Sequence, residues 1–87
     1  MQDLIKVYIE LCGLSGYFSG ETRISIRVSR NLASAVQEIR DLLQEKQIKT
    51  PYIMYVNDIF VQKISLDEGC TVSKGDVFKI MPVFSGG

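Results

Sequence analysis

The feature that most constrains the fold is a single change in the spacing of apolar residues near the middle of the chain. Before residue 30 and after residue 51, apolar residues tend to alternate with polar ones, which is typical of β-strands with one buried face. Over residues 32–43 they recur instead at intervals of three and four, which predicts an amphipathic α-helix. No second sizeable helix is visible, so one helix has to cover one face of one sheet.

The strand-like segments are short and are separated by turn signals. They lie at residues 5–11, 23–29, 52–56, 59–64 and 77–81. The Gly- and Ser-rich stretch 13–20 is expected to be a loop, and Asn57-Asp58 a turn. Asn31 or Ser34 is the expected N-cap of the helix. Pro82 is expected to end the regular pairing of the last strand.

This order of elements predicts the α+β class and, within it, a β-grasp (ubiquitin-like) fold. We expect a mixed sheet of about four to five strands with one main helix packed on one face. The final strand is expected to insert beside the first. With 87 residues the chain has room for one small domain, so we expect residues 1–87 to form a single domain in which residues 82–87 are a flexible C-terminal tail.

Charge and hydropathy narrow the class of partner. Ten basic and ten acidic residues give a net charge of zero, which argues against a nucleic-acid partner. No run of about 18 apolar residues is present, so no membrane-spanning helix and no membrane partner are expected. The N-terminus lacks the basic and apolar regions of a secretory signal. A cytoplasmic location is the simplest expectation.

The chain contains no histidine, which removes the commonest general base and the usual nucleophile pairs. Cys12 and Cys70 are far apart and form no metal-binding motif, so we expect reduced, mostly buried thiols and no metal site. No phosphate-binding loop or nucleophile elbow is present. We therefore expect a substrate or carrier protein rather than an enzyme, with a partner supplying the catalytic groups.

The sequence ends in Gly86-Gly87, directly after an apolar strand. A diglycine has no Cβ atoms, so it can enter a narrow active site and adopt conformations that other residues cannot. Gly87, with Gly86 before it, is therefore the candidate reactive group of the chain.

Three segments carry a resemblance to a known family. They are the first strand, which opens almost at residue 1, the segment Tyr55-Val56-Asn57, and the end of the chain, in which Lys74-Gly75-Asp76-Val77 leads through an apolar strand to the stretch from Met81 to Gly87. Together they resemble the MoaD/ThiS family of sulfur carriers, and most closely the small subunit of molybdopterin synthase. The family's common ending has two prolines before the valine, and here Met81 stands in place of the first.

The resemblance implies a mechanism that acts at Gly87. A ubiquitin-activating-type adenylyltransferase, using ATP, would adenylate its carboxylate. A persulfide sulfur supplied by a sulfurtransferase would then displace AMP and leave a thiocarboxylate. This group would deliver sulfur within the large subunit of molybdopterin synthase or another sulfur acceptor enzyme. The chain itself would bind no cofactor, and its main contribution would be to position the tail.

Apolar residues near the tail and on the outer face of the sheet are candidates for partner docking, with packing against the core as the alternative. They are Tyr8, Phe60, Met81, Pro82, Val83 and Phe84. The basic cluster Arg23, Arg27 and Arg30 is either solvated or in contact with an acidic partner surface.

Other functions fit the same fold and tail. The chain could be a ubiquitin-like protein modifier that is conjugated to lysine through Gly87. It could carry sulfur for thiamine, cysteine or another metabolite. A non-catalytic β-grasp binding module with an inert terminus is the third alternative, and a conventional enzyme is the least expected.

Overall fold

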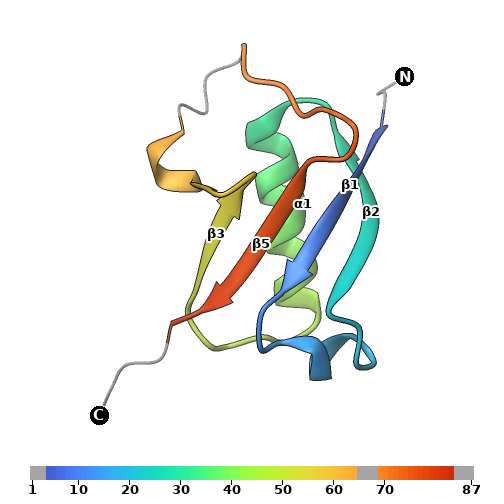
Figure 1. Ribbon diagram of the computed structural model, residues 1–87, viewed down its shortest axis with the longest axis vertical. Coiled ribbons are helices and arrows are strands. Elements are labelled where there is room, and N and C mark those ends of the chain that lie inside the picture. Colours follow the sequence, from blue (N-terminus) through green and yellow to red (C-terminus); the bar gives the residue numbers. More distant parts are fainter. Residues whose placement is uncertain (1–3, 65–68, 84–87) are drawn as a thin grey trace.

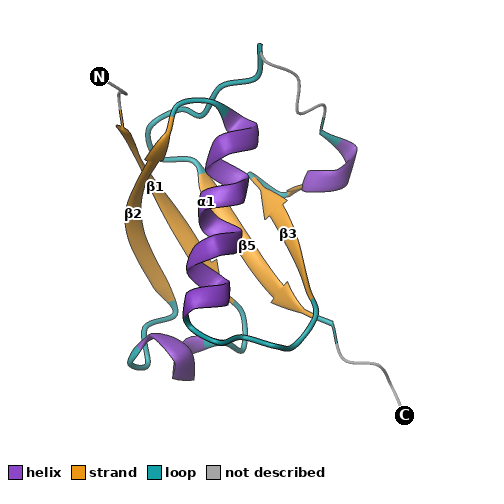
Figure 2. Ribbon diagram, turned by 180° about the vertical axis from the view of Figure 1, so that it is seen from behind, coloured by secondary structure: helices purple, strands orange, loops and turns teal. Residues whose placement is uncertain are grey.

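The computed structural model describes residues 4–64 and 69–83. In chain order its elements are β1 (Leu4–Leu11), the 3-10 helix η1 (Ser15–Phe18), β2 (Arg23–Ser29), α1 (Leu32–Glu45), β3 (Tyr52–Val56), β4 (Ile59–Phe60), the 3-10 helix η2 (Val61–Lys63) and β5 (Val77–Pro82). The strands form one sheet in the order β2-β1-β5-β3-β4. The helix α1 crosses one face of this sheet (Figures 1 and 2). The predicted β-grasp fold is confirmed.

The last strand, β5, lies in the centre of the sheet. It runs parallel to β1, with Leu11 opposite Ile80, and antiparallel to β3, with Met54 opposite Ile80. The first and last strands of the chain are thus hydrogen-bonded neighbours (Figure 1). The expectation that the final strand inserts beside the first is confirmed.

The core lies between α1 and the sheet face that it covers. Alternation on β1 and β5 directs Val7, Ile9, Phe78 and Ile80 into it, and all four are fully buried. The helix supplies its apolar stripe, whose buried members are Leu32, Ala35, Val36, Ile39 and Leu43. The alternating apolar residues of the strands and the apolar stripe of the helix therefore pack together in a single core.

Two polar contacts fix the start of α1 and its position on the sheet. Asn31 is the N-cap, and its side-chain oxygen accepts a hydrogen bond of 2.9 Å from the Ser34 N–H. One turn further along, the Glu38 carboxylate accepts hydrogen bonds from the Ser29 N–H (3.0 Å) and from the Ser29 hydroxyl. The helix is thereby tied to the end of β2 as well as packed against it.

The strand predicted over residues 59–64 is shorter in the structure. Asn57 and Asp58 both have positive φ (50° and 69°), which makes a tight two-residue hairpin between β3 and β4. After Ile59–Phe60 the chain curls into η2, and Val61 turns inward to 3% exposure. The strand therefore ends where Val61 enters the core, which alternation alone does not reveal.

Pro82 was predicted to end the pairing of the last strand, and this was wrong. Pro82 lies within β5 opposite Tyr52, and the next residue, Val83, donates its N–H to the Pro51 carbonyl at 2.8 Å. Successive N–H groups of a strand point to opposite sides. The N–H that Pro82 lacks would therefore point toward β1. Pairing between β1 and β5 ends at Leu11 and Ile80, two residues before Pro82, so the missing donor breaks no hydrogen bond between these strands.

Candidate functional site

The site begins where β5 leaves the sheet. Cys12 donates its N–H to the Ile80 carbonyl at 3.1 Å, and Gly13, with φ of +72°, then turns the chain away from β5. A Cβ atom at Gly13 would lie 3.7 Å from the Pro82 ring, so the turn passes close to that proline. On the other side, the bond from Val83 to the Pro51 carbonyl holds β5 against the chain before β3. Backbone hydrogen bonds therefore fix the direction of β5 up to Val83.

The predicted reactive residues follow directly in the sequence. Gly86, Gly87 and the docking candidate Phe84 lie outside the described residues. Val83 is 42% exposed, and Pro82 is half-buried.

A patch of apolar residues covers the outer face of the sheet beside this exit. Met81 is 38% exposed and lies opposite Ile53, while the ring of Tyr55 packs against Phe60 at 5.8 Å between centroids. Alternation along β3 places Ile53 and Tyr55 on the same face, away from α1. We call these four residues, Ile53, Tyr55, Phe60 and Met81, the apolar corner.

The other half of the outer face carries cations around Tyr8, together with Glu10, which lies opposite Arg23. The half-buried ring of Tyr8 carries the Arg23 guanidinium 4.7 Å from its centroid and the Lys6 ammonium 5.8 Å from it. In the β1–β5 register Tyr8 lies opposite Val77, four residues before Met81. That spacing corresponds to about 13 Å along the strand.

The structure therefore brings together only part of the predicted docking set. Phe60 and Met81 share the apolar corner, with Pro82 and Val83 next to it in the chain, whereas Tyr8 stands apart beside Arg23 and Lys6. Phe60 also packs against the core, which was the alternative to docking. The corner also includes Ile53 and Tyr55, which were not among the predicted docking residues. The signal for them was present in the alternation of residues 52–56, where Met54 and Val56 are the buried pair.

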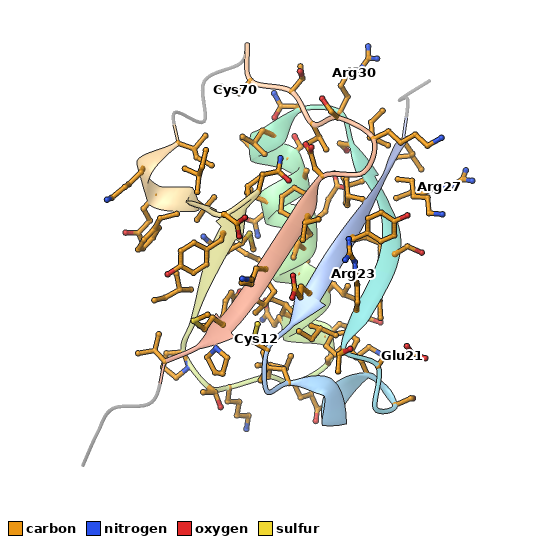
Figure 3. All side chains as sticks on the ribbon, in the orientation of Figure 1. Cys12, Glu21, Arg23, Arg27, Arg30 and Cys70 are labelled. Carbon is orange, nitrogen blue, oxygen red and sulfur yellow. The ribbon has the colours of Figure 1, made fainter. Side chains whose placement is uncertain are left out.

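Within residues 4–64 and 69–83 no group of three or more His, Cys, Asp or Glu side chains could hold a metal ion. Cys12 and Cys70 are both half-buried, and Figure 3 places them at opposite ends of the domain. No helix in the described part of the chain is both long enough and apolar enough to cross a bilayer.

Comparison with known proteins gives matches of structure. No family model matches the sequence, and no curated protein matches it. The solution structure of the small archaeal modifier protein 1 (SAMP1) from Methanosarcina acetivorans matches with a TM-score of 0.66 at 13% identity, covering 98% of this chain and 99% of that one. The solution structure of the Haloferax volcanii HVO 2177 protein matches with a TM-score of 0.65 at 16% identity, covering 97% of this chain and 88% of that one. The chain therefore has the ubiquitin-like β-grasp fold.

Proposed function

We propose that this chain is a cytoplasmic sulfur carrier of the MoaD/ThiS type that acts through a thiocarboxylate on Gly87. The observation that carries the proposal is the course of β5. A central strand, hydrogen-bonded up to Val83, is separated from Gly86-Gly87 by only two residues of sequence. A fixed base that leads within a few residues to a terminus without side chains suits a group that must reach into another enzyme's active site.

The chemistry needs no catalytic group from the chain itself. A ubiquitin-activating-type adenylyltransferase would direct the Gly87 carboxylate onto the α-phosphate of ATP, and pyrophosphate would leave. The terminal sulfur of a sulfurtransferase persulfide would then attack the acyl carbon and displace AMP. A second thiol would then attack the sulfurtransferase cysteine sulfur of the resulting acyl disulfide. This attack would form a disulfide between the two thiols and release the thiocarboxylate of Gly87.

The apolar corner is the surface that we assign to docking on the acceptor enzyme. Met81, Pro82 and Val83 continue from the corner toward the tail, together with Phe84 in the sequence, so one partner can contact the corner while it encloses the tail. Aromatic residues and methionine are enriched at the cores of such interfaces. We propose the large subunit of molybdopterin synthase as the acceptor. The alternatives are carriers for thiamine, cysteine or another metabolite, in which a different acceptor takes the sulfur.

Intact-mass measurement of the chain isolated from its native cells tests the proposal. A fraction of the molecules should carry sulfur in place of one oxygen at Gly87. A sulfur-transfer assay with the activating enzyme, ATP and a persulfide donor should fail for the variant that lacks Gly87. Normal sulfur transfer by that variant would contradict the proposal.

Gly16→Ala is a matched control in the same assay. A Cβ atom at Gly16 meets nothing within 4 Å, so this substitution also changes a glycine but leaves the tail intact. It should transfer sulfur at the rate of the unaltered chain.

The second candidate is a protein modifier that forms an isopeptide bond to lysine through Gly87. It is favoured by the structural likeness to the small archaeal modifier protein 1. Both functions begin with the same adenylate. Peptide mapping of cell extracts separates them, because a modifier leaves Gly87 joined to lysine side chains of other proteins, whereas a carrier alone does not.

A further inference from the structure

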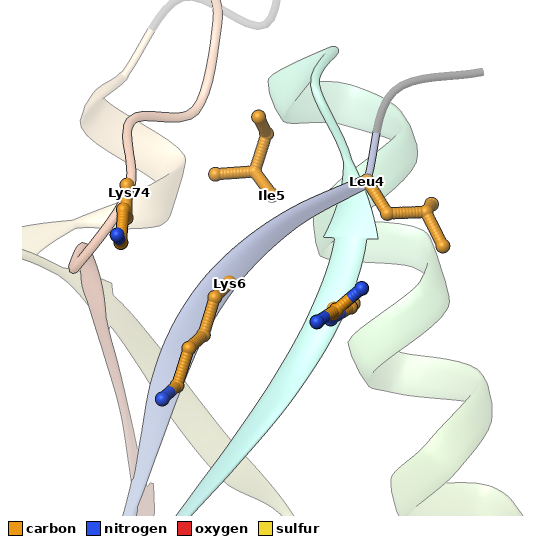
Figure 4. Close-up of a pocket in the computed structure, with 5 residues that line it drawn as sticks. Leu4, Ile5, Lys6 and Lys74 are labelled. Carbon is orange, nitrogen blue, oxygen red and sulfur yellow. The ribbon is translucent and has the colours of Figure 1, made fainter.

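A pocket of about 310 Å³ lies at the end of the sheet where β1 and β5 begin, away from the tail. It is lined by Leu4, Ile5, Lys6, Arg27 and Lys74. Figure 4 shows Lys6 on β1 and Lys74 on the neighbouring turn before β5, and Arg27 comes from β2. Three cationic side chains from three separate segments therefore surround one pocket.

The sheet register places two of these cations opposite each other. Lys6 and Arg27 are paired residues of β1 and β2. Like charges directly opposite on neighbouring strands are destabilising. In a chain of zero net charge this pairing concentrates positive charge at a cost in stability, which an anionic ligand would offset.

The acidic residue closest to Lys74 in the described sequence is already engaged. The two carboxylate oxygens of Asp76 accept hydrogen bonds from the Ser73 N–H (2.9 Å) and the Asn57 side-chain amide (3.0 Å). The same turn is fixed to β1 by the bond from the Gly75 N–H to the Lys6 carbonyl (2.9 Å). Lys74 is thus held beside Lys6 while Asp76 is bound elsewhere.

No carboxylate in residues 4–64 and 69–83 forms an ion pair with any of the three pocket cations. Within these ranges the ion pair that does form joins Lys79 to Asp58, at 3.8 Å. The pocket also has an apolar component, because the side chain of Leu4 is 54% exposed at its rim. A ligand that suits both features is acidic and carries an apolar group.

We propose that this pocket docks a segment of a partner protein in which carboxylate side chains flank an apolar side chain. Charge complementarity selects the acidic residues, and the exposed side chain of Leu4 accommodates the apolar one. β1 is eight residues long, so the pocket lies about 23 Å along the sheet from the base of the tail. The site is separate from the tail and does not depend on any chemistry at Gly87.

The test is an NMR titration of the full chain with a capped pentapeptide of four glutamates around a central leucine. At low ionic strength the backbone amide signals of residues 4–6, 27 and 74 should shift, and the shifts should vanish in high salt. The matched peptide with glutamine in place of glutamate should not bind. Replacement of the peptide leucine by glycine should weaken binding, because it removes the contact with Leu4.

Two triple variants locate the site. Lys6→Gln, Arg27→Gln and Lys74→Gln together should weaken binding by about tenfold, because three exposed charge pairs each contribute a modest free energy. Arg40→Gln, Lys49→Gln and Lys63→Gln together change the net charge equally at exposed positions outside the pocket, and should weaken binding by less than about twofold. The single variant Lys74→Gln, on an exposed turn, tests the site should the first triple variant fail to fold.

Three outcomes would overturn the proposal. Equal weakening in both triple variants would mean that the peptide responds only to net charge. Binding of the glutamine peptide with the same affinity would mean that charge plays no part. Equally tight binding of inorganic phosphate, or of phosphatidylserine vesicles, with the same shifts would assign the pocket to a small anion or to a membrane surface.

Discussion

The two faces of β5 differ sharply although they belong to one strand. Phe78 and Ile80 point under α1 and are fully buried, whereas Lys79 is half-buried and Met81 is 38% exposed on the opposite face. The inner face is held by close packing, in which loss of even one methylene group is felt. The outer face has few such constraints, so its side chains are free to suit a partner. One strand thus serves the fold on one side and recognition on the other.

The largest effect is expected on the inner face. Phe78→Ala removes a fully buried ring from the centre of the sheet and should lower the free energy of unfolding by about 3–5 kcal/mol. That is a large part of the total stability of a small domain. Urea unfolding followed by circular dichroism measures the loss. A midpoint unchanged from that of the unaltered chain would show that the inner face is not the main source of stability.

An intermediate effect is expected where a polar group ties the helix to the sheet. Glu38→Ala leaves the Ser29 N–H and hydroxyl without their acceptor, and Ser29 is only 8% exposed. The loss should be about 1–3 kcal/mol in the same unfolding experiment. Glu45→Ala, at the exposed end of the same helix, is the control and should change stability by no more than about 0.5 kcal/mol. Equal losses in the two variants would contradict a specific role of Glu38.

The smallest effect on stability is expected on the outer face. Met81→Ala should cost less than about 1 kcal/mol, because the side chain is partly exposed and packs on one side only. Replacement of its inward-facing neighbour on β5, Ile80, by alanine should lower the free energy of unfolding by about 2–5 kcal/mol. Because Met81 belongs to the proposed docking surface, Met81→Ala should nevertheless slow sulfur transfer to the acceptor enzyme in a single-turnover assay. If Met81→Ala destabilised the domain as much as Ile80→Ala, the two faces would not differ as described.

Much of this fold could be predicted from the spacing of apolar residues. The alternation in residues 52–56 and the three- and four-residue intervals after Asn31 correspond to β3 and α1. The local sequence pattern could not show that Pro82 remains in a strand. This depends on the neighbouring strands, since pairing with β1 ends at Ile80 whereas pairing with β3 continues to Pro82. Nor could the local pattern show that Val61 turns inward, since burial is decided by tertiary packing.

The candidate site, too, could be predicted only in part from the sequence. The tail and Met81 follow from the sequence, but the apolar corner depends on the register between β3 and β5, which places Ile53 opposite Met81. Likewise, the pairing of Lys6 with Arg27 depends on the β1–β2 register. Contacts between strands that are distant in the chain are properties of the assembled sheet, so residue spacing within one strand does not encode them.

The central position of the last strand has a consequence for the order of events during synthesis. Without β5, β1 and β3 have no common neighbour, and Phe78 and Ile80 are missing from the core. The ribosome must therefore synthesise β5 before the sheet can close, because the contacts that join the two halves of the sheet are distant in sequence. A chain terminated before β5 would lack the strand that joins the two halves of the sheet.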